Sequence, residues 1–175
     1  MRQSCTPQKR AAPYFYVGRN NRKGIHVPNI VHRIGIEGAT AERVYQAVAT
    51  REGVASWWTE NVNGESAVGS VLQFIFGKGG PAFQVLELTP PARVRWKCVA
   101  GPAEWIDTRI HFDISHKDGE TVLLFKHCGW REEVEFMHHC STQWAYFLIG
   151  LKQLLEAGKG RPYGPRFEPI SRWSR

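Results

Sequence analysis

The chain has 175 residues, of which 42% are hydrophobic, and a formal net charge of +7. This length suits one domain with terminal extensions and a core large enough to need no disulfide or structural metal. No apolar stretch approaches the ~18 residues of a membrane span, and no continuous apolar segment follows the basic N-terminus. We therefore expect neither a transmembrane helix nor a secretory signal.

The positive charge is concentrated at the two ends of the chain. Residues 1–29 hold six Lys or Arg and no acid, residues 158–175 hold five Lys or Arg and one Glu, and the body between them holds 12 basic and 15 acidic residues. Solubilising tails explain this pattern better than a nucleic-acid groove, so nucleic acid is an unlikely partner. We expect a mostly irregular extension over residues 1–29, in which residues 14–17 could pair as an edge strand, a folded domain over 30–162 and a basic tail over 163–175.

The four cysteines indicate neither a zinc site nor a disulfide framework, because no two of them form a CxxC pair. Buried free thiols are typical of a reducing compartment, so a cytoplasmic location is expected. The cysteines are Cys5, Cys98, Cys128 and Cys140.

The sequence contains no motif for a phosphate loop, a dinucleotide site or a nucleophilic serine. Glu135-x-x-His138 has the spacing of half a di-iron site, but such sites need a second copy and further carboxylates. We therefore expect no metal and no other cofactor, and we assign no catalytic residue.

Short strands follow one another through most of the folded region. Alternation over residues 31–37 predicts a first strand, Thr40 is a plausible N-cap for a helix after it, and a second short helix is expected from about Glu52. The turn signal Asn63-Gly64 leaves room for one more strand around residue 62. Beyond it, a period of two predicts five strands, over residues 71–76, 83–88, 93–99, 105–115 and 121–128.

A long amphipathic helix is predicted over residues 132–157, with apolar residues at three- and four-residue steps and Gly158 just beyond its end. At 1.5 Å per residue it would be about 38 Å long, longer than most sheets are wide. Strands joined by short turns form an antiparallel meander, so we expect an α+β fold with the sheet packed against this helix. One long helix across a curved sheet leaves a space, which we take as the candidate site.

Large rings are concentrated on the apolar face of the predicted sheet and on the helices. Each ring buries about 150–250 Å², so the set either packs as a core or lines a cavity of about 300–1,000 Å³. Both interpretations stay open at this stage. The residues that we expect to contact a ligand are Trp57, Trp58, Phe74, Phe83, Trp96, Thr108, Phe112, Phe125, His127, Trp144, Phe147 and Leu148.

His127 is the main polar candidate, because it shares its predicted face with Leu123 and Phe125. It could donate a hydrogen bond to a ligand, act as an acid or base, or be a core histidine bonded to backbone. Thr108 leaves similar possibilities. Since the inward face holds few ionisable groups, binding without catalysis is the favoured interpretation.

The order of these segments resembles the SRPBCC superfamily, the START and birch-pollen-allergen-like helix-grip proteins. Within it, the chain is most similar to the group named for the activator of heat-shock protein 90 ATPase homologues. The resemblance covers about residues 30–162. It is carried by residues 39–45, 54–58, 85–91, 121–130 and 144–160.

The resemblance implies a helix-grip fold, in which a curved antiparallel sheet of about seven strands wraps around the C-terminal helix, with two short helices after the first strand. It also implies an apolar cavity for a lipid-like, aromatic or polyketide-like molecule. Three functions follow as hypotheses: a hydrophobic ligand binder, a cyclase or dehydratase that uses His127 in the same cavity, and a module that stimulates a chaperone ATPase in the stress response. Fold analogy alone does not choose between them.

Overall fold

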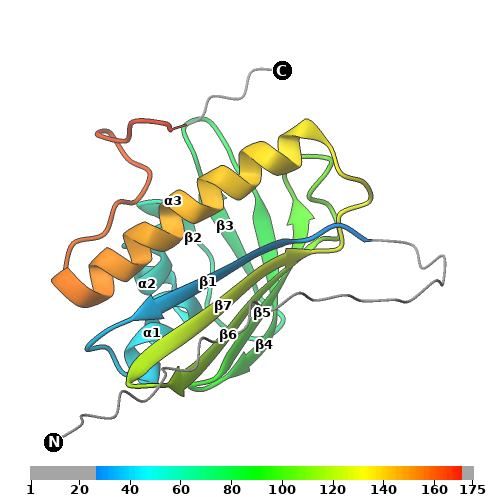
Figure 1. Ribbon diagram of the computed structural model, residues 1–175. Helices are drawn as coiled ribbons and strands as arrows, with labels where there is room; N and C mark the ends of the chain where they lie inside the picture. The colour runs from blue at the N-terminus through cyan, green and yellow to red at the C-terminus, as the bar shows by residue number, and fades with distance from the viewer. Residues whose placement is uncertain (1–26, 171–175) are drawn as a thin grey trace, which may run out of the picture.

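The computed structural model describes residues 27–170. Its seven strands form one antiparallel sheet in the order β1-β7-β6-β5-β4-β3-β2 (Figure 1). The strands are β1 (Ile30–Ile36), β2 (Asn61–Asn63), β3 (Val71–Ile75), β4 (Ala82–Thr89), β5 (Arg93–Ala100), β6 (Arg109–Lys117) and β7 (Glu120–Cys128), and the helices are α1 (Ala41–Ala49), α2 (Arg51–Ala55) and α3 (Glu135–Ala157).

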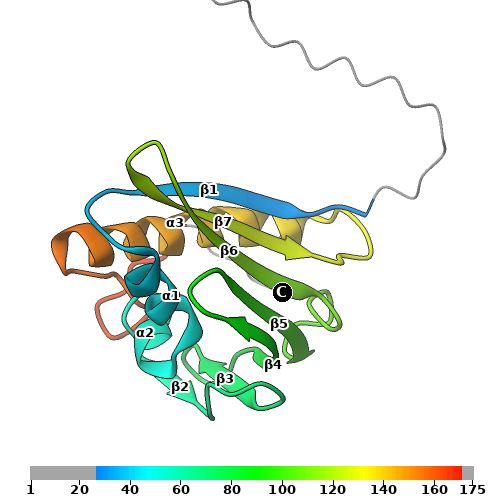
Figure 2. The ribbon, with the colours of Figure 1, turned by 90° about the horizontal axis from the view of Figure 1, so that it is seen from below.

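The sheet curls into a half-barrel, and α3 lies across its open side (Figure 1). Helices α1 and α2 close one end of the half-barrel, as the view from below shows (Figure 2). The α+β helix-grip prediction is therefore confirmed, including the two short helices after the first strand and the extra strand near residue 62.

Pairing of the first strand with the last one completes the half-barrel. Strand β1 pairs antiparallel with β7, from Ile30 opposite His127 to Ile36 opposite Thr121. This pairing places β1 beside α3, where the Lys152 ammonium donates a hydrogen bond to the Gly35 carbonyl oxygen at 2.6 Å. The long helix is thereby fastened to one edge of the sheet and leaves the opposite edge open to other segments.

The short helices are capped by threonines. The Thr40 hydroxyl accepts a hydrogen bond from the Arg43 N–H at the start of α1, and the Thr50 hydroxyl accepts one from the Gly53 N–H at the start of α2. Helix α3 ends at Gly158, whose φ of 71° is the left-handed conformation that glycine adopts without strain. The helix therefore stops where the sequence predicts, and the chain is free to turn back.

Two predicted boundaries need correction. The long helix begins at Glu135 rather than at residue 132, after Val134 in extended conformation. The strand predicted from residue 105 begins at Arg109, because the preceding residues form tight turns: the Trp105 N–H bonds to the Pro102 carbonyl, and Asp107 has a φ of 68°. The possible edge strand at residues 14–17 lies outside the described residues.

The helices of residues 27–170 are all too short or too polar to cross a bilayer. The core that they share with the sheet is rich in rings. Its fully buried side chains include Trp57, Trp96 and Phe112, and the Trp57 indole N–H donates to the Ala47 carbonyl oxygen at 2.9 Å. Close packing of this kind makes large-to-small substitutions costly.

Two neighbouring leucines of β7 test this description of the core. Leu123 is fully buried and Leu124 is 48% exposed on the outer face. Leu123→Ala should lower the free energy of unfolding by about 2–5 kcal/mol, because it leaves a cavity. Leu124→Ala, the matched control, should lower it by less than about 1 kcal/mol. Urea denaturation followed by tryptophan fluorescence measures both, and equal losses would contradict the assigned strand register.

Candidate functional site

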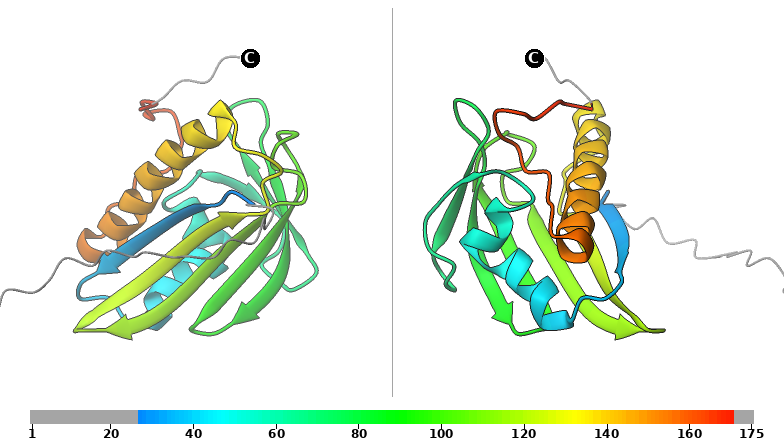
Figure 3. Two further views of the ribbon diagram at one scale, coloured as in Figure 1. Left: turned by 45° about the vertical axis from the view of Figure 1, so that its right-hand side comes forward. Right: turned by 90° about the vertical axis from the view of Figure 1, so that its left-hand side faces the viewer.

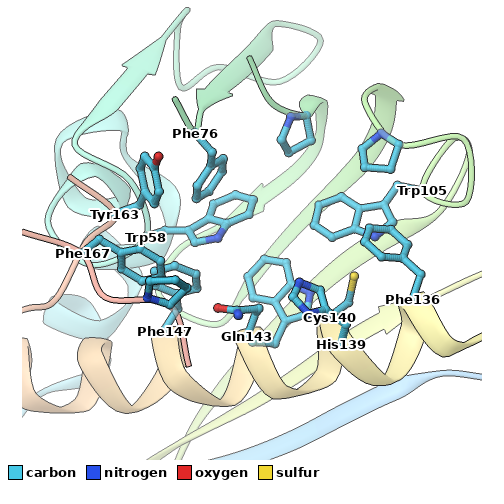
Figure 4. Close-up of a pocket in the computed structure, with 14 residues that line it drawn as sticks. Trp58, Phe76, Trp105, Phe136, His139, Cys140, Gln143, Phe147, Tyr163 and Phe167 are labelled. Carbon is cyan, nitrogen blue, oxygen red and sulfur yellow. The ribbon is translucent and has the colours of Figure 1, made fainter. Parts of the chain in front are cut away.

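A pocket of about 630 Å³ lies between α3 and the far edge of the sheet (Figure 4). Four walls enclose it: the turn after α2 together with the β3–β4 turn, the loop after β5, the first half of α3, and the chain beyond α3. The residues that line it are Trp58, Phe76, Pro81, Pro102, Trp105, Phe136, His139, Cys140, Gln143, Trp144, Phe147, Tyr163, Phe167 and Pro169.

Aromatic rings dominate these walls. Trp58 and Trp105 lie on opposite sides of the pocket, with Gln143 and His139 projecting from α3 between them (Figure 4). The Trp144 ring is 4.8 Å from that of Trp58 and 6.2 Å from that of Trp105, measured between centroids, and it stacks almost parallel to Trp105 at 15°. Flat apolar faces are thus presented to the cavity from several directions.

The polar content of the lining is small and carries little charge. Among the described lining residues there is no Asp, Glu, Lys or Arg. Burial lowers the pKa of His139 from its ordinary value, which favours the neutral imidazole at physiological pH. The site therefore provides an apolar surface with a few uncharged hydrogen-bonding groups.

The chain beyond α3 forms one complete wall. We call residues 159–170 the C-terminal strap. It turns back at the end of the helix and runs between α3 and the sheet edge that carries β2 and β3 (Figure 3). Tyr163 and Phe167 of the strap line the pocket.

Only three of the residues predicted to contact a ligand line this pocket: Trp58, Trp144 and Phe147. The others lie behind the walls, buried in the core, because the sheet and helices close upon one another below the pocket. Phe125, for example, packs 4.6 Å from Trp144 and supports it from the sheet side. The buried set comprises Trp57, Phe74, Phe83, Trp96, Thr108, Phe112, Phe125, His127 and Leu148.

Several lining residues lie outside the set predicted to contact a ligand. Trp105, which the alternation predicts on a strand, stands in a turn. Tyr163 and Phe167 belong to the segment predicted to be a basic tail. A useful signal was present in both cases: aromatic residues within Gly- and Pro-containing segments beside the predicted helix and sheet.

His127 connects two walls of the pocket through hydrogen bonds. The Trp144 indole N–H, which can only donate, lies 3.2 Å from His127 Nδ1, so Nδ1 accepts and Nε2 carries the proton. Nε2–H then donates to the Thr108 hydroxyl at 2.8 Å, and that hydroxyl donates to the Trp105 carbonyl oxygen at 2.5 Å. The relay fixes the tautomer of the histidine and joins Trp144 to the Trp105 turn.

These contacts argue against acid–base work by His127. Its side chain is fully buried and is not among the lining residues. Burial lowers the pKa of His127 to about 3, and a proton added at Nδ1 would face the Trp144 N–H. His127 is thus a positioning residue, although its partners are side chains rather than the backbone expected of a core histidine.

Metal ligation finds no support in the part of the chain that the structure describes. No group of three or more His, Cys, Asp or Glu side chains gathers there in a geometry that could hold an ion. The candidate site is accordingly described by its apolar walls.

The curled sheet, the long helix across it and the apolar pocket between them define a helix-grip protein of the SRPBCC type. The family described as Activator of Hsp90 ATPase homolog 1-like protein matches residues 38–156, and the chain belongs to this family. No curated protein matches the chain.

Solved structures agree with this assignment. The Aha1 dimer from Colwellia psychrerythraea is 44% identical, with a TM-score of 0.69 over 76% of this chain and 99% of that one. Protein SSP2350 from Staphylococcus saprophyticus is 15% identical, with a TM-score of 0.64 over 77% and 97%. CalU16 from Micromonospora echinospora is 17% identical, with a TM-score of 0.61 over 75% and 78%. The last two show the shared fold alone.

The buried histidine makes stability depend on pH. The ordinary pKa of His127 is 6.5, and in the folded protein it falls to about 3, so between these values the unfolded chain binds more protons. The free energy of unfolding should therefore decrease as the pH falls below about 6.5, by up to about 1.4 kcal/mol per pH unit from this group. His127→Gln should remove that part of the slope.

Urea denaturation at a series of pH values compares the two proteins. Leu123→Ala serves as the control, because it destabilises the core while His127 remains, and it should keep the wild-type slope. Equal slopes for wild type and His127→Gln would mean that His127 is not held neutral in the folded protein.

Proposed function

We propose that this protein binds an uncharged, hydrophobic small molecule in the pocket between α3, the sheet edge and the C-terminal strap. The main support for this proposal is the pocket lining, which is largely aromatic and, among the described residues, has no Asp, Glu, Lys or Arg. Its volume of about 630 Å³ lies within the range of small-molecule sites.

The chemistry of the walls favours an uncharged occupant. A ligand carboxylate or phosphate would lose its water without gaining a cation from Lys or Arg, since none of residues 27–170 of these types lines the pocket, and burial lowers the pKa of His139. Of the lipid-like, aromatic and polyketide-like classes, flat ring systems gain most, because they stack on Trp58, Trp105 and Phe147 in addition to burying area. The Gln143 side chain brings an amide N–H group and an amide oxygen to the lining.

Binding without catalysis is the form of this proposal that the geometry supports. An acid–base reaction needs a titratable group that reaches the substrate at a pKa suited to the reaction. His127, the residue on which a cyclase or dehydratase hypothesis rests, is buried behind the pocket and bonded on both ring nitrogens. We therefore do not propose that reaction.

A second candidate function comes from the family and from one relative. The chain belongs to a family named for activation of the heat-shock protein 90 ATPase, and a 44% identical relative is described as an Aha1 dimer. On this proposal, exposed surfaces contact a chaperone, or a second copy of the chain, and the pocket is not required. An ATPase assay with purified chaperone tests this second proposal. If a variant that no longer binds hydrophobic probes still stimulates the ATPase, the surface that contacts the chaperone is independent of the pocket.

A charge placed in the wall tests the binding proposal. Gln143→Arg should weaken binding of hydrophobic probes by about tenfold or more, because a guanidinium loses water when an apolar ligand covers it. Gln153→Arg makes the same change on the same helix, outside the pocket lining, and should bind as wild type does.

NMR titration with fluorenone, naphthol and dodecanol measures the affinities. Saturable shifts should occur at the indole N–H signals of Trp58, Trp105 and Trp144 in the wild type and in Gln153→Arg. If no probe gives a saturable shift with the wild-type protein, the binding proposal is wrong.

A further inference from the structure

We infer that the C-terminal strap is a specificity-determining part of the binding site, with Tyr163 and Phe167 contacting the bound molecule. The inference rests on the proposed binding function. It adds that one wall of the binding site comes from residues outside the family match. The family match ends at residue 156, whereas the strap covers residues 159–170.

Backbone hydrogen bonds anchor the strap beside the pocket. The Tyr163 N–H donates to the Trp58 carbonyl oxygen at 2.9 Å, and the Glu60 N–H donates to the Tyr163 carbonyl oxygen at 3.0 Å. Together they form a parallel bridge between Tyr163 and Thr59. The strap is therefore bound to the backbone of a residue that itself lines the pocket.

Ring contacts connect the strap to both neighbouring walls. Tyr163 packs 5.2 Å from Phe76 on the sheet side, and Phe167 stacks on Phe147 of α3 at 5.6 Å and 13°. The two strap rings also lie 5.0 Å from each other. The strap thus continues the aromatic lining from the sheet edge to the helix, as the arrangement of these rings in Figure 4 shows.

Gly160 allows this close approach. A Cβ at Gly160 would collide with the Ser56 carbonyl oxygen, so only glycine lets the strap lie against the end of α2. The docked position of the strap is therefore encoded in the sequence.

The strap adds much to the pocket and little to the core. Within residues 27–170, the last residue of the buried hydrophobic core is Leu155, and Tyr163 and Phe167 are only partly buried against it. Yet Tyr163, Phe167 and Pro169 all line the pocket. A segment whose side chains serve the site more than the core is expected to influence binding more than stability.

The experiment compares strap variants with a glycine control. Phe167→Ala removes a ring from the wall, Gly160→Ala displaces the strap without changing a lining residue, and Gly79→Ala adds a methyl group where no atom of another residue lies within 4 Å. The tightest-binding probe of the fluorenone, naphthol and dodecanol set is used for all proteins. A second readout is the rate of Cys140 alkylation, resolved by peptide mass spectrometry, since Cys140 lines the pocket.

Both strap variants should keep a cooperative thermal transition, lose at least about fivefold in probe affinity and alkylate Cys140 several-fold faster, while Gly79→Ala matches the wild type. Wild-type affinity in folded Phe167→Ala or Gly160→Ala would overturn the inference and leave the proposed function standing. Absence of probe binding by the wild type would overturn both. If Gly160→Ala does not fold, the probe affinity of Phe167→Ala alone decides whether the inference holds.

Discussion

The indole of Trp144 sets the boundary between the close-packed core and the pocket. Its ring contacts Phe125 on the sheet side and Trp58 at the end of α2, and its N–H is held by His127. Helix α3 lines the pocket from Phe136 to Phe147, whereas Leu148, Leu151 and Leu155 are buried in the core. One face of the first half of the long helix therefore borders the pocket, whereas its second half contributes only to the core.

The relay through His127 explains how a polar group is tolerated at this boundary. A buried indole N–H without an acceptor costs about 1–3 kcal/mol, and a buried hydroxyl has a comparable requirement. One neutral imidazole satisfies both, because it accepts at one nitrogen and donates at the other. The same arrangement removes the histidine from chemistry, since each ring nitrogen already has a partner and burial opposes a charge. Because the relay begins at the Trp144 indole and ends at the Trp105 carbonyl, it fixes these two tryptophans of the pocket wall relative to each other.

The sequence permitted prediction of the elements, their order and the fold class, because periodicity records which face of each strand or helix is apolar. It did not permit prediction of which apolar residues remain uncovered. Phe112 and Phe125 face inward as expected, but both are buried, Phe112 beside Trp57 and Phe125 beside Trp144 of α3. The distance between the sheet and the helices depends on strand register and sheet curvature. An alternation pattern contains neither of these. Trp105 was misplaced for a related reason: its turn interrupts an apparent alternation that continues on both sides of it.

The C-terminal strap lies beyond the part of the chain that the family match covers. Three walls of the pocket come from segments within the family match, and the fourth comes from residues beyond it. The strap also has two chemically different sides, since Arg161 and Arg166 are exposed while Tyr163 and Phe167 turn toward the pocket. Positive charge in this segment therefore describes its outer surface and gives no reason to expect an anionic ligand within. A segment that contributes little to the core tolerates substitution with little loss of the fold, so on the proposed function we expect changes in this wall to alter binding more than stability.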